Sequence, residues 1–186
     1  MKIIETYRLF DKTTTSRYTF KSAGGTIKEI AKGLDKLKQD LFDAPQSLKK
    51  TYHKAILRIV RDTQKAITPS RTETWYRYKD EFTEKGTDFG PHLEHVIPQN
   101  KIVTAYLHDK IPAEFVLQMP LCLIDDADKH TLEGDWQQSG DWQHPFRRYK
   151  LAGYNKVIKD VRGNVIDLDR HTIQDHFKML GYHEGI

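Results

Sequence analysis

Residues 92–98 read His92-Leu93-Glu94-His95-Val96-Ile97-Pro98. A glutamate and a histidine stand side by side near the end of this apolar stretch, just before a proline that cannot donate to a strand ladder. The stretch therefore predicts a short β-strand over residues 92–97. A carboxylate and an imidazole at its end can hold a divalent cation and take a proton from water near neutral pH.

A second strand and a helix are expected further along the chain. Residues 119–124 are apolar and typical of a strand, and the three aspartates within residues 125–128 suit the positive end of a helix dipole. His130 would then lie in the first turns of that helix. The expected order is strand, irregular connection, strand and helix.

This order resembles the HNH family of nucleases, which have a ββα-metal core, and the resemblance covers residues 90–134. It implies that Glu94 and His130 bind one divalent metal, Mg²⁺ or Mn²⁺, while His95 acts as the general base. Asn100 is the nearest counterpart of the family's middle asparagine. The chain departs from the family in having glutamate where aspartate is more common, and in lacking the Cys-x-x-Cys pairs of many members.

Glu94 and His95 are adjacent, and adjacent residues of a regular strand point to opposite faces of the sheet. They can serve one site only where the strand ends or twists. Pro98 supports an ending close to them.

The residues before this core predict an N-terminal β-hairpin and two long amphipathic helices. Residues 2–10 and 13–20 are rich in Ile, Thr, Tyr and Phe, which favour strands. Apolar residues then recur at helical spacing from Ile27 to Leu41 and from Leu48 to Ile67. We expect these two helices to form an antiparallel pair.

The residues after the core predict a hairpin over residues 157–168 and a closing helix over residues 169–180. The predicted fold class is therefore α+β. Residues 1–89 would carry DNA-binding elements, and residues 90–186 an HNH-like catalytic region with a C-terminal extension.

Charge is distributed unevenly along the chain. Residues 1–90 contain 19 Lys and Arg against 12 Asp and Glu, whereas residues 91–186 contain 11 against 14. A basic half beside a slightly acidic half suits a surface that grips a polyanion, although uneven solvated charge gives the same count.

Several cations are candidates for contact with nucleic acid. Five recur every three or four residues on one stripe of the second helix, and two follow a tryptophan-containing loop. A further cation lies among the aromatic residues 75–78, which fit either base stacking or a half-buried strand. The candidates are Lys50, Lys54, Arg58, Arg61, Lys65, Arg77, Arg147 and Arg148.

Other features narrow the class of protein. No stretch approaches the roughly 20 apolar residues of a membrane helix, and the start of the chain lacks a signal-peptide core, so a cytoplasmic protein is expected. Cys122 is the only cysteine, which excludes an internal disulfide and paired-cysteine zinc sites.

The leading hypothesis is a metal-dependent endonuclease acting on DNA, such as a site-specific restriction enzyme working as a homodimer. The alternatives are a non-catalytic nucleic-acid-binding protein, a toxin-type HNH nuclease, and a hydrolase of small phosphoesters. His171, His176 and His183 could form a second metal cluster, or could be polar residues of the closing helix.

Overall fold

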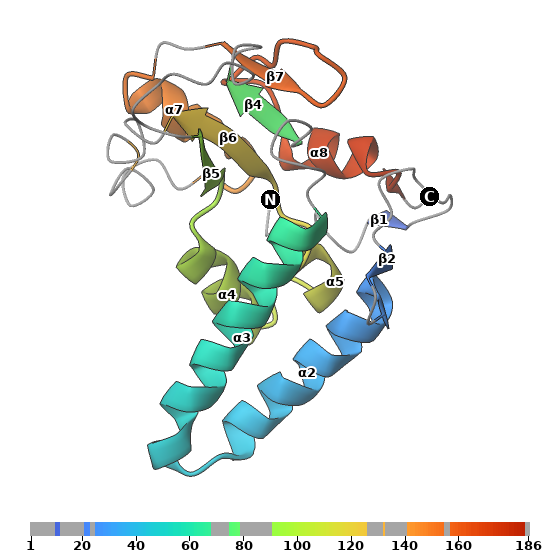
Figure 1. The fold of residues 1–186 in the computed structure, drawn as a ribbon, viewed down its shortest axis with the longest axis vertical. Coiled ribbons are helices and arrows are strands. Elements are labelled where there is room, and N and C mark those ends of the chain that lie inside the picture. The colour runs from blue at the N-terminus through green and yellow to red at the C-terminus, as the bar shows by residue number, and fades with distance from the viewer. Residues whose placement is uncertain are drawn as a thin grey trace. The chain divides into compact units, whose positions relative to one another are not determined.

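The computed structural model describes residues 10–11, 21–22, 25–67, 75–78, 91–125, 132, 141–154 and 157–184, and Figure 1 shows their helices and strands. The chain divides into two compact units. Unit 1 comprises Met1–Ile67, Pro98–Met119 and Leu180–Ile186, and unit 2 comprises Thr68–Ile97 and Pro120–Met179. Neither unit is one continuous segment, whereas the sequence predicts a single division after residue 89.

Unit 1 is built on the two long helices α2 (Ile27–Asp43) and α3 (Gln46–Ile67). They run antiparallel, as Figure 1 shows, and a short turn joins them in which the Leu48 amide donates to the Pro45 carbonyl at 2.9 Å. Each helix buries one apolar stripe, with Leu34 and Ile56 fully buried. The predicted helical pair is confirmed. The two helices pair because an apolar stripe at i, i+3 and i+4 must be covered by another element.

The connection that follows residue 97 belongs to unit 1 and contains two helices, α4 (Gln99–Leu107) and α5 (Ala113–Val116). The expectation of an irregular connection is therefore wrong. Helix α4 ends in a Schellman motif, in which the Asp109 amide donates to Tyr106 O at 3.0 Å and the Lys110 amide to Ala105 O at 2.9 Å. Asp109 takes the left-handed conformation of this motif, with φ 56°.

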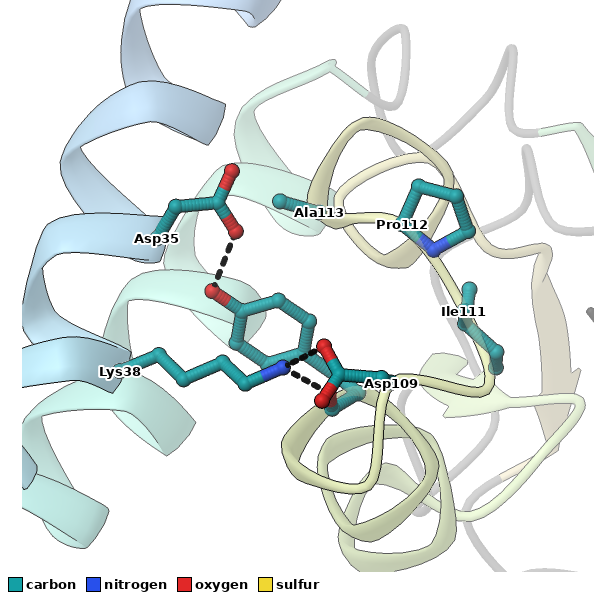
Figure 2. A pocket seen from close by; sticks show the side chains of 7 residues that line it. Asp35, Lys38, Asp109, Ile111, Pro112 and Ala113 are labelled. Carbon is teal, nitrogen blue, oxygen red and sulfur yellow. Dashed lines mark hydrogen bonds and ion pairs between the residues drawn. The ribbon is translucent and has the colours of Figure 1, made fainter. Parts of the chain in front are cut away.

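Polar contacts join α2 to the end of α4 in unit 1. The Lys38 ammonium donates to the Tyr106 carbonyl at 2.9 Å and to Asp109 Oδ1 at 2.5 Å, and the Tyr106 hydroxyl donates to Asp35 Oδ1 at 2.8 Å. These residues line a hollow of about 430 Å³ that Figure 2 shows, with Ile111, Pro112 and Ala113 on its other side.

Unit 2 contains a four-stranded mixed sheet in the order β5-β6-β4-β7. The central strand β6 pairs antiparallel with β5 and parallel with β4, and β4 pairs antiparallel with β7. Residues 121–124 of β6 are fully or almost fully buried, as a central strand requires. The strands are β4 (Tyr76–Tyr78), β5 (Pro91–His95), β6 (Leu121–Asp125) and β7 (Ile158–Asp160).

Two helices of unit 2 are α7 (Arg147–Leu151) and α8 (Ile173–Met179). The Tyr76 ring on β4 packs against Phe146 at 4.5 Å and against His176 on α8 at 5.7 Å between ring centroids. Helix α8 begins with a capping box, in which Thr172 and Asp175 satisfy each other's amide groups at 2.8 and 3.1 Å. The closing helix is confirmed and is shorter than predicted.

The predicted C-terminal hairpin is present around β7. Lys159 bridges Val165, and the Ile166 amide donates to Ile158 O at 3.0 Å. Gly163 turns the chain with φ 86°, a conformation that suits glycine.

The predicted N-terminal hairpin lies almost wholly outside the described residues. Its residues 10–11 form β1 (Phe10–Asp11), which pairs with β8 (His183–Glu184). A separate short pair joins β2 (Lys21–Ser22) to β3 (Gly25–Thr26). None of the helices in the described part of the chain has the length and apolar character needed to cross a bilayer.

Candidate active site

The two strands expected for an HNH-like core are present and pair antiparallel. Every residue of β5 has a partner in β6, from Pro91 opposite Asp125 to His95 opposite Leu121. After His95 the chain bends, and α4 begins at Gln99. The strand therefore ends at the Glu94-His95 pair, as Pro98 predicts. The third element, the helix expected to carry His130, lies outside the described residues except for Asp125 and Leu132.

The regular pairing of β5 places alternate side chains on alternate faces of the sheet. His92 and Glu94 share one face, and the side chains of these two residues approach to 3.4 Å. His95, directly opposite Leu121, belongs to the other face with Leu93. The strand ends one residue too late to bring Glu94 and His95 to the same side.

Glu94 forms an ion pair with Arg148 of α7. Arg148 Nη2 donates to Glu94 Oε1 at 2.6 Å, and the Arg148 side chain is only 2% exposed whereas that of Glu94 is 21% exposed. The second carboxylate oxygen, Oε2, lies 3.4 Å from His92 Nε2. Both oxygens of Glu94 thus face nitrogen atoms of the protein.

Buried side chains lie next to this pair in the sheet. Cys122 lies directly opposite Glu94 in the sheet and is fully buried. Burial, with a smaller contribution from Glu94, raises the pKa of the Cys122 thiol, and burial also raises that of the Tyr149 hydroxyl beside it. The Cys122 thiol is therefore protonated at neutral pH, which makes it a poor nucleophile.

His95 is half-buried at the end of β5. The backbone next to it remains fixed, because the Val96 amide donates to Pro120 O at 3.2 Å. Its Nε2 atom is buried, and an imidazole can accept a proton only from a water that reaches one of its ring nitrogens.

Asn100, the nearest counterpart of the middle asparagine, lies exposed in the first turn of α4. This places it in unit 1, whereas Glu94 and His95 belong to unit 2. Its role stays a prediction.

The described residues do not fit the single-metal site expected from the sequence. An ion at Glu94 would lie on the face opposite His95, and Arg148 already occupies one carboxylate oxygen. Within the described ranges, no three His, Cys, Asp or Glu side chains gather as a ligand set. Ligation by Glu94 and His130 stays a prediction because His130 is outside those ranges.

The basic stripe of α3 is exposed along its whole length, at Lys50, Lys54, Arg58, Arg61 and Lys65. The sequence reading overlooked Asp62 within it. Asp62 accepts hydrogen bonds from Arg61 at 3.2 Å and from Arg58 at 3.4 Å, and the Arg61 bond lowers the pKa of Asp62. Its charge offsets part of the stripe.

The remaining candidate cations have different surroundings. Arg147 is exposed and lies 3.8 Å from Asp169, and Arg77 is half-buried in β4. Arg148 could contact nucleic acid directly only if its buried pair with Glu94 opened.

Two histidines of the proposed second metal cluster do converge, but on a tyrosine. The buried Tyr76 hydroxyl is hydrogen-bonded to His171 Nε2 at 2.9 Å and to His176 Nδ1 at 3.2 Å. Burial lowers the pKa of His171, which favours its neutral form. This is the arrangement of a buried polar network. The side chain of His183 lies outside the described part of the chain.

The sequence analysis assigns no role to His92, which lies beside Glu94 in the structure. It stands two positions before Glu94, the spacing that brings two side chains to one face of a strand.

Comparisons with protein-family models, with curated proteins and with solved structures gave no match to this chain.

Proposed function

We propose that this protein is an HNH-type endonuclease that hydrolyses DNA phosphodiester bonds. The observation that carries the proposal is the antiparallel pairing of β5 and β6, with His95 as the last residue of β5. This is the strand pair in which the resemblance places the general base.

His95 is the group to which we assign the proton transfer. A neutral imidazole can take a proton from an attacking water. The resemblance also implies Mg²⁺ or Mn²⁺ as cofactor, and the assignment of His95 does not depend on which residues hold that ion.

The exposed stripe on α3 supports a polyanionic substrate. Its cations lie three or four residues apart, and therefore on one side of a helix of 22 residues. Such a row can follow a phosphate backbone without reading its sequence. Site-specific restriction by a homodimer belongs to the same proposal, since two active sites cut both strands symmetrically.

Plasmid cleavage in the presence of Mg²⁺ or Mn²⁺ tests the proposal. The wild type should cleave, His95→Ala should lose at least about 100-fold in rate, and His108→Ala should cleave like the wild type. His108 is a matched control because it is an exposed histidine at the end of α4. An inactive wild type, or a fully active His95→Ala, refutes the proposed function.

A non-catalytic nucleic-acid-binding protein is the second candidate. The ion pair between Glu94 and Arg148 favours it, because that pair accounts for a carboxylate at this position without any metal. This candidate predicts salt-dependent DNA binding that neither requires nor responds to a divalent metal.

A further inference from the structure

The Glu94 carboxylate is already engaged in a strong ion pair, unlike a carboxylate that is free to bind a metal ion. Its partner, Arg148, comes from a helix more than 50 residues further along the chain, and the guanidinium is almost completely excluded from water. A charge-assisted hydrogen bond of 2.6 Å is at the short end of the usual range. Any cation that binds Glu94 must therefore deal with this guanidinium.

The charges on this face oppose the binding of a metal ion in addition to the Arg148 guanidinium. The carboxylate and the guanidinium sum to zero, so a divalent ion approaching Glu94 meets no net attraction from the pair. Repulsion from a buried guanidinium is screened less than repulsion from one that lies in solvent.

A cation that approaches Glu94 without displacing Arg148 would bind the other carboxylate oxygen, Oε2. Arg148 engages Oε1, whereas Oε2 faces His92, whose side chain is 38% exposed. A nitrogen and an oxygen 3.4 Å apart can both reach one ion at bond lengths of about 2.1 Å. An ion bound by both oxygens of Glu94 would have to displace Arg148. An ion bound by Oε2 and His92 would be repelled by the charge of Arg148.

We infer that Arg148 competes with a divalent cation for Glu94, so that the buried guanidinium sets how weakly this face of the sheet binds metal. The inference rests on the metal dependence in the proposed function. It assigns to Arg148 the role of limiting metal binding at Glu94, in place of a direct phosphate contact.

Calorimetric titration with Mn²⁺ alone tests the inference. Arg148→Gln removes a positive charge that lies 2.6 Å from the carboxylate and repels the ion, so this variant should bind Mn²⁺ at least about tenfold more tightly than the wild type. Arg148→Lys keeps the charge and should stay within about threefold of the wild type. Glu94→Gln should abolish the tighter binding.

The outcomes separate this inference from the proposed function. Binding by the wild type that Arg148→Gln leaves unchanged or weakens overturns the inference alone. An absence of Mn²⁺ binding in both proteins, together with an inactive wild type, overturns the metal-dependent nuclease as well.

A second measurement tests the charge of Arg148 by another route. Arg148→Ala leaves space for free guanidinium, which can be added at concentrations far below those that unfold proteins. If Arg148 competes through its charge, added guanidinium should weaken Mn²⁺ binding by Arg148→Ala several-fold and leave the wild type unaffected. Equal effects on the two proteins contradict the inference. Circular dichroism confirms that each variant is folded.

Discussion

Replacing Tyr76 by phenylalanine should destabilise the protein far more than the loss of one oxygen atom suggests. The Tyr76 hydroxyl is fully buried and is hydrogen-bonded to both His171 and His176. A hydroxyl has one donor and two acceptor sites, so it can serve two ring nitrogens at once. Phenylalanine fills nearly the same volume and removes only this link.

The expected magnitude follows from the burial of the two histidines. His176 is fully buried, and a buried polar atom deprived of a hydrogen bond costs about 1 to 3 kcal/mol. His171 is partly exposed, so water can replace its bond and the loss is about 0.5 to 1.5 kcal/mol. We expect Tyr76→Phe to lower the free energy of unfolding by about 1.5 to 4.5 kcal/mol.

Urea unfolding followed by tryptophan fluorescence measures this effect. Trp75 is 1% exposed and its ring lies 6.3 Å from that of His176, so its emission reports on this part of unit 2. Tyr106→Phe is the matched control, since the Tyr106 hydroxyl donates only to the exposed Asp35, which water can solvate again. That change should cost about 1 kcal/mol or less when circular dichroism follows the helices. Equal small losses in the two variants would refute the argument.

Three further predictions follow from the described contacts. Burial lowers the folded-state pKa of His171, so the free energy of unfolding should be constant above pH ~6.5 and fall as the pH drops below it; urea titrations at several pH values should show this slope, and His171→Gln should flatten it. Lys54→Glu with Arg58→Glu should reduce the slope of log affinity for DNA against log salt by about 2, measured by fluorescence anisotropy, and an unchanged slope argues against contact by α3. Asp109 has φ 56°, so Asp109→Val should lower the free energy of unfolding by about 1 to 2 kcal/mol more than Asp109→Asn does. Equal free energies of unfolding for the two variants, measured by calorimetry, contradict strain at this position.

The sequence predicts the long helices and the paired strands well because their signals are local. Apolar residues at helical spacing place α2 and α3 almost to the residue. The apolar runs of β5 and β6 predict both strands, and Pro98 predicts where β5 stops. In each case the residues that determine the element lie within it or beside it.

The elements that the sequence reading missed depend on distant contacts. Helix α7 has only five residues, and its Arg148 is identified as a partner of Glu94 only when the chain has folded. Likewise, nothing in the separate segments shows that Tyr76 lies between two histidines about 100 residues further on. Pairings of this kind leave no periodic signal in the sequence.

The Glu94-His95 pair shows why a dipeptide is weaker evidence for a site than its two residue types suggest. Neighbours in sequence are separated by a sheet when the strand is regular, and β5 is regular through His95. A shared site would need the chain to leave the strand between the two residues, where it instead leaves one residue later. Glu94 consequently joins His92 and Arg148, and His95 faces the other side. His95→Ala should therefore lose cleavage and leave Mn²⁺ binding at Glu94 unchanged, and weaker Mn²⁺ binding by His95→Ala would contradict the placement of the two side chains on opposite faces of β5.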